Sequence, residues 1–165
     1  MKNNVLKQIL VGLAASGLVG APLSVLAGAS ANQTVTFEIR AISELSVSGN
    51  PGNLTVSAAT AGSVPTLASD ASTTYNYTAN QPRKITAALN TALPAGVTLS
   101  VALASPTGGT SPGDVSLATT PANVVTAIPP VSEPAKTITY KLSATSDAGV
   151  IGPTPAVVTF TIAAP

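Results

Sequence analysis

Apolar and polar residues alternate along much of the chain, most strictly in five runs. Residues 34–41 are one of these runs, and one side of an extended strand there would carry Val35, Phe37, Ile39 and Ala41. The same period of two returns in residues 84–90, 96–104, 138–144 and 158–162. Because successive side chains of a β-strand point to opposite faces, the pattern predicts half-buried strands.

Weaker strand signals lie at residues 45–48, 54–58, 73–79, 115–118 and 124–128. Clusters of Gly and Pro, such as residues 49–52 and 106–114, separate the runs and predict turns. Short strands with turns every 8–12 residues or so favour two antiparallel sheets. We therefore expect an all-β fold, an immunoglobulin-like antiparallel β-sandwich of about eight to nine strands over residues 32–165. We expect Phe37, Tyr140 and Phe160 to lie in its core, because each falls on the apolar side of a run.

The first 31 residues differ from the rest. Lys2 and Lys7 precede an apolar, Gly- and Ala-rich run, and the small residues Ala29-Ser30-Ala31 follow it. A basic start, an apolar middle and a small-residue exit are the three parts of a secretory signal peptide. We predict that residues 1–31 are this signal, with cleavage after Ala31 or, as the second choice, after Ala27. Glycines and Pro22 interrupt the run, so we expect no membrane span after cleavage.

The composition argues against catalysis, nucleic-acid binding and metal binding. The chain of 165 residues has no His and no Cys, so it offers no imidazole base, thiolate or ordinary zinc site. Loss of Lys2 and Lys7 would leave five basic and six acidic side chains, too few and too scattered to bind nucleic acid. Asp114 and Asp147 lie in loops but lack the converging ligands that calcium requires. We predict no catalytic, cofactor-binding or metal-binding residues, and no enzyme activity.

The two terminal strands are near copies of each other. Residues 34–41 read Thr-Val-Thr-Phe-Glu-Ile-Arg-Ala, and residues 158–163 read Val-Thr-Phe-Thr-Ile-Ala. The second run would place Val158, Phe160 and Ile162 on one face, and it has no charge or proline to block pairing with another strand. Natural edge strands normally carry such a block. The closing strand is therefore either internal to a sheet, or its edge is meant to be occupied.

An alternating strand directly after the leader, together with a closing strand rich in Thr and Val, resembles the exported pilins of chaperone–usher systems. The archaic, spore-coat-U-like branch is the most similar. The resemblance covers both ends of the chain and its strand rhythm, and the cysteine pair usual in that family is absent. It implies a bacterial surface protein in which the N-terminal strand of one subunit completes the sandwich of the next, with an export chaperone or other surface proteins as further partners.

Two functions follow from these observations. The first is a secreted, self-assembling subunit of a surface fibre, pilus or matrix, which binds copies of itself by β-strand addition. In this hypothesis Val35, Phe37, Ile39 and Ala41 are the donor-strand side chains, and Val158, Phe160 and Ile162 form the closing strand. The alternative is a stand-alone adhesive or carbohydrate-binding sandwich that uses loops 105–114 and 145–155. Tyr75 and Tyr77 are then the candidate sugar-binding aromatics, because shallow sugar sites use exposed aromatic rings.

Overall fold

A computed structural model describes residues 30–165 of the chain. Nearly all of the regular structure in this part is β-strand, and a single turn of 3₁₀ helix, η1 (Ser146–Ala148), is the exception. The strands are β1 (Ser43–Val47), β2 (Ala68–Ala79), β3 (Arg83–Leu89), β4 (Val97–Leu103), β5 (Val115–Ser116), β6 (Ala122–Ile128), β7 (Val131–Ala144) and β8 (Val158–Ala163). The predicted signal peptide lies outside the described residues, apart from its last two, so it stays a prediction.

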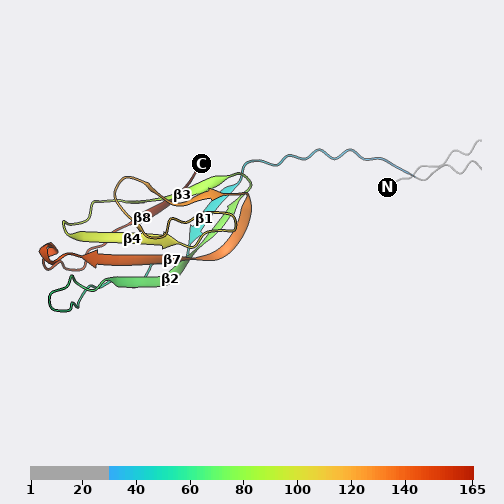
Figure 1. Cartoon of the computed structure of the whole chain (residues 1–165). Coiled ribbons are helices and arrows are strands. Elements are labelled where there is room, and N and C mark those ends of the chain that lie inside the picture. The colour runs from blue at the N-terminus through green and yellow to red at the C-terminus, as the bar shows by residue number, and fades with distance from the viewer. Residues whose placement is uncertain (1–29) are drawn as a thin grey trace, which may run out of the picture. The chain divides into compact units, whose positions relative to one another are not determined.

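The strands form two sheets (Figure 1). The first has five strands in the order β1-β2-β7-β4-β5, and the second has three in the order β6-β3-β8. Every neighbouring pair is antiparallel. The all-β prediction with two antiparallel sheets is therefore confirmed.

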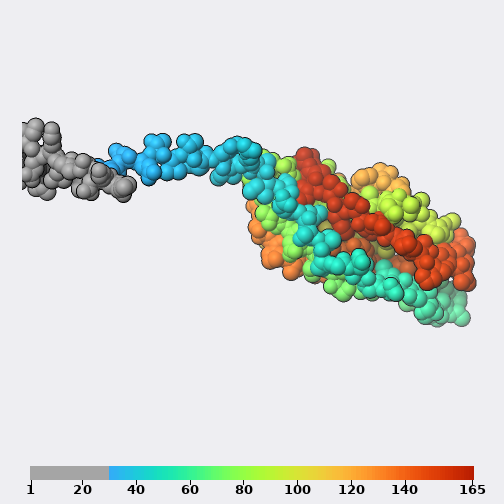
Figure 2. Space-filling view, turned by 180° about the vertical axis from the view of Figure 1, so that it is seen from behind, coloured from blue at the N-terminus to red at the C-terminus, as the bar shows by residue number. Residues whose placement is uncertain are grey.

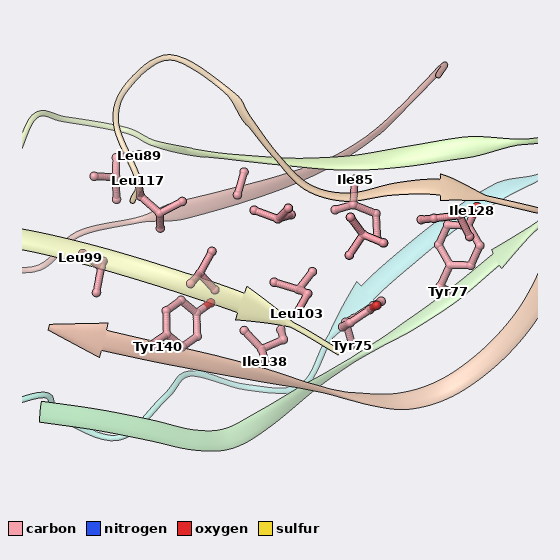
Figure 3. Close-up of a cluster of buried hydrophobic side chains, with 14 of the residues drawn as sticks. Tyr75, Tyr77, Ile85, Leu89, Leu99, Leu103, Leu117, Ile128, Ile138 and Tyr140 are labelled. Carbon is pink, nitrogen blue, oxygen red and sulfur yellow. The ribbon is translucent and has the colours of Figure 1, made fainter. Parts of the chain in front are cut away.

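Side chains from both sheets pack into one core. Its largest fully buried members include Tyr75 and Tyr77 of β2, Ile85 of β3, Ile128 of β6 and Ile138 of β7. Figure 3 shows these residues between the ribbons of the two layers. The alternation along β3 and β4 places Ile85, Ala87 and Leu89 inward, and likewise Leu99, Val101 and Leu103, as the sequence predicts. Burial of this apolar surface is the main favourable term that holds the sheets together.

Two strand predictions fail. Residues 34–41 form no strand, and the first strand begins at Ser43. Residues 54–58 also form no ladder, although Leu54 and Val56 are half-buried and alternate with exposed neighbours. Both segments have the side-chain pattern of a strand, but neither pairs along its length with a neighbouring strand among the described residues, and the backbone hydrogen bond from Thr66 to Ala58 lies at the end of the second. A pattern predicts which side of a segment is apolar, while a ladder requires a partner.

The predictions of which aromatic residues lie in the core are partly right. Tyr140 is buried and Phe160 is half-buried, whereas Phe37 is exposed and the prediction of a core Phe37 is wrong. The most deeply buried aromatic residues are Tyr75 and Tyr77, each 1% exposed. Tyr75 donates a hydrogen bond from its hydroxyl to the carbonyl oxygen of Ala104 at 2.5 Å. Burial raises the pKa of both tyrosines.

Candidate functional site

The four edge strands of the two sheets are not equally open. Strand β1 has five residues and carries Glu44, and β5 has two residues. A backbone bridge between Thr110 and Thr126 engages β6. Short length, charge and coverage are the usual means by which proteins prevent edge-to-edge pairing. Each of these three edges has one of them.

Strand β8 lacks the first two of these protections, and the chain after β1 runs beside it without forming a ladder. It pairs with β3 through six successive residues without a bulge, and its sequence is uncharged. No strand among residues 30–165 pairs with its other side. The predicted closing-strand residues Val158, Phe160 and Ile162 alternate with exposed Thr159 and Thr161, so they face the core, yet each is half-buried. Among residues 30–165, β8 is therefore an edge strand rather than an internal one, with apolar side chains that are incompletely covered.

A cleft of about 1410 Å³ lies beside this edge, and we call it the β8 cleft. Leu99, Ile138 and Tyr140 of the five-stranded sheet line it, and Val158 and Phe160 line it from β8. Its lining also includes residues 49–59, which connect β1 to β2, and residues 144–158, which lead from β7 into β8. Seen from behind in Figure 2, the chain after β1 and the red strand β8 run side by side along this face. The cleft thus opens the core to the outside along the free edge.

Residues 49–59 form one wall of the β8 cleft, and we call them the strap. The strap is fixed at its start, because the backbone N–H of Ser48, just before it, donates to the carbonyl of Thr74, and the Asp70 carboxylate lies against Gly52. The next anchor is the hydrogen bond from Thr66 N–H to the carbonyl of Ala58. Among the described residues, no backbone hydrogen bond joins residues 53–57 to a neighbour. The cleft therefore has an unpaired backbone on the strap as well as on β8.

The predicted donor-strand side chains are exposed in the described chain. Val35 is 75%, Phe37 84% and Ile39 79% exposed. Such large apolar side chains in a row, with polar Thr36 and Glu38 between them, are the pattern of a strand that has one apolar and one polar face.

The next residues after Ile39 are fixed to the domain. The side chain of Asn80, just after β2, donates to the carbonyl of Arg40 at 2.7 Å and accepts from the N–H of Ile42 at 2.8 Å. The backbone N–H of Asn80 donates to the carbonyl of Ile42 at 3.3 Å. We call this clamp the root of the N-terminal segment. Ala41, the fourth predicted donor residue, lies inside it.

The ionisable groups are dispersed, and several of them have local partners. Glu133 pairs with Lys136 and accepts a hydrogen bond from the N–H of Thr107, and these contacts lower its pKa to about 2. Asp114 pairs with Lys141 at 2.6 Å. Among residues 30–165 no three His, Cys, Asp or Glu side chains gather as a metal site would require. The Glu133 and Asp114 carboxylates therefore form local ion pairs with lysines.

The alternative of a sugar site loses its candidate aromatics. Tyr75 and Tyr77 were the residues able to stack on a sugar, and both are buried in the core. Their rings cannot contact a ligand at the surface. Loops 105–114 and 145–155 carry no aromatic residue.

No family model matches the chain, and no match is found among curated proteins or solved structures. Within the described residues, no helix has the length and apolar character needed to cross a bilayer.

Proposed function

We propose that this chain is a secreted, non-enzymatic structural subunit that assembles with copies of itself, with the N-terminal segment of one copy adding to β8 of the next. The observation that carries the proposal is the free, uncharged edge of β8 beside an open apolar cleft. The same chain carries an exposed segment whose apolar face matches that of β8 in spacing. Strand addition to an open edge uses backbone hydrogen bonds for affinity and alternate side chains for specificity.

The strand order supports an immunoglobulin-like interpretation of the fold. If β1, β2, β4 and β7 are taken as strands A, B, D and E, the five-stranded sheet contains the order A-B-E-D of that fold. Strands β3 and β8 then correspond to C and F of the second sheet. In a complete immunoglobulin domain strand G pairs with F on the side away from C. That position is the free edge of β8, so the proposal assigns the missing strand to a neighbouring copy.

The direction of the added strand follows from the sheets themselves. All described strand pairs are antiparallel, so an antiparallel addition continues the pattern of β6-β3-β8. Val35, Phe37 and Ile39 then face the cleft along with Val158, Phe160 and Ile162. Thr36 and Glu38 face solvent with Thr159 and Thr161. The proposal places the protein outside the cell or on a bacterial surface, and predicts that an export chaperone protects the same edge before assembly.

The test is a deletion combined with a matched substitution. The full chain after leader removal is compared with a variant lacking residues 32–39, which keeps the root intact. We expect fibres by negative-stain microscopy, and a ladder on unheated gels, from the full chain and monomers from the deletion. Thr36→Ala, on the polar face, should assemble like the full chain. Fibres from the deletion variant would refute the donor role.

A further inference from the structure

We infer that the loop between β7 and β8 is a second contact surface for another copy of this chain, with the fully exposed Val150 at its centre. The partner surface is the region around the root, at Asn80 and the two residues that follow it. The inference rests on the proposed function, since it concerns where two copies meet once a strand has been added. The loop also lines the β8 cleft, and the inference assigns a further role to its fully exposed Val150.

The direction of β8 determines where the added strand leaves the cleft. Strand β8 runs from Val158, which pairs with Leu89, to Ala163, which pairs with Lys84. An antiparallel donor runs the other way, so its C-terminal end leaves the cleft beside Val158. The residues just before Val158 are the β7–β8 connection, residues 145–157. The donor therefore passes this loop as it returns to its own domain.

The donor segment has no spare residues between its last inward-facing side chain and the root. Ile39 is its last inward-facing side chain before the root, and the carbonyl of the next residue, Arg40, is already bonded to Asn80. One residue of an extended chain spans about 3.3 Å. If Ile39 is inserted beside β8 of one copy, Asn80 of the donating copy must lie within a few ångströms of the cleft mouth. The two domains then abut, and Ala41 stays on its own domain.

The β7–β8 loop and the region around the root both carry exposed apolar side chains. Val150 is fully exposed, Ile151 is 43% exposed, and no charged residue lies between Ala148 and the start of β8. Around the root, Ile42 is 43% exposed, and the exposed Gln81 and Pro82 are uncharged, while Arg40 belongs to the root and the Arg83 guanidinium donates to Gln81. Contact between the two surfaces therefore buries apolar area beside a partner surface that carries positive charge. A second copy is thus a chemically suitable occupant as well as one that the short connection requires.

Val150→Lys tests this contact in the full chain, because it places a positive charge against Arg40 and Arg83 of the partner surface while replacing a side chain that is exposed to solvent. We expect loss of sedimentable fibres with no change in the thermal unfolding midpoint of the monomer. Adding Gln81→Glu to the same chain should restore assembly by pairing the two charges across copies. Because Val150 also lines the β8 cleft, binding of a peptide of residues 32–41 is measured as well, and it should be unchanged in Val150→Lys; loss of that binding would overturn the inference. Val64→Lys is the matched control, since Val64 is also exposed but does not line the cleft.

The outcomes separate this inference from the proposed function. If the unmodified chain forms fibres and Val150→Lys forms them equally well, the second contact does not exist and strand addition stands. Equal loss of fibres in Val150→Lys and Val64→Lys would also overturn the inference, because the effect would then be a general one of added charge. If the unmodified chain forms no fibres, the proposed function itself fails.

Discussion

Phe37 should matter greatly for assembly and hardly at all for the stability of the monomer. Its side chain is 84% exposed in the described chain, so truncation to Ala removes little packing there. Full burial of a Phe side chain stabilises by about 1.5–3 kcal/mol relative to exposure, so insertion beside β8 should contribute about 1–2.5 kcal/mol. Since about 1.4 kcal/mol corresponds to tenfold in affinity, Phe37→Ala should weaken strand addition about fivefold to sixtyfold.

The assay uses a fluorescent peptide of residues 32–41 and a domain that lacks residues 32–39. Fluorescence anisotropy measures the dissociation constant of the unmodified peptide, of the Phe37→Ala peptide and of a Thr36→Ala control. We expect the control to bind like the unmodified peptide, because Thr36 lies on the polar face. Urea unfolding of the full chain carrying Phe37→Ala should change by no more than about 0.5 kcal/mol, as for other exposed sites. Equal affinities of the Phe37→Ala and unmodified peptides would refute the assignment of Phe37 as an inserted side chain.

Three further predictions concern the fold. Tyr75→Phe should destabilise the domain by about 0.5–1.5 kcal/mol in urea unfolding, because the hydroxyl bonds Ala104, while Tyr77→Phe should cost less, since its hydroxyl has no partner in the described chain; equal costs would contradict this. Gly96→Ala should lower the unfolding midpoint more than Gly62→Ala: both have positive φ, but a Cβ at Gly96 would lie 2.6 Å from a neighbouring hydroxyl, whereas Gly62 faces open space. Glu133 has a lowered pKa, so its stabilising contribution is present at neutral pH and is lost as the pH falls from 4.5 toward 2. Urea unfolding at several pH values should show Glu133→Gln less stable than the parent at pH 7, with the difference vanishing near pH 2; a gap independent of pH would contradict the account.

Much of the fold follows from the period-two pattern. The runs at 84–90, 96–104 and 158–162 became β3, β4 and β8 with the predicted faces inward. Strand β6 departs from it, because Val124 and Val125 are adjacent and both buried, and the register with β3 shifts at this point. A bulge of this kind arises from the partner strand, and a single segment does not reveal its partner.

The sequence predicts one part of the candidate site, the uncharged strand, but not its position in the sheet. The lack of any charge or bulge signal in residues 158–163 indicated an unprotected strand, but not whether another strand covered it. That depends on β8 falling at the end of the order β6-β3-β8, which long-range pairing decides. The burial of Tyr75 and Tyr77 was missed for a related reason. Asn76 between them marks the alternation correctly, yet the polar hydroxyls made a surface role equally reasonable.

The alternation in the strap is a further feature of the sequence that bears on the candidate site. Leu54 and Val56 alternate with polar residues, and the segment was predicted as a strand, but it forms no ladder. The N-terminal segment fails in the same way. In both segments the alternation predicts an apolar face and does not identify the strand that would pair with it.

Hydrogen exchange followed by mass spectrometry tests the central claim most directly. The domain lacking residues 32–39 is labelled with and without a saturating excess of the peptide of residues 32–41. The account predicts that the peptide slows exchange in β8, residues 158–163, at the amides that β3 does not already engage, and leaves β5 and β6 unchanged. Exchange in β8 that is identical with and without bound peptide would contradict it.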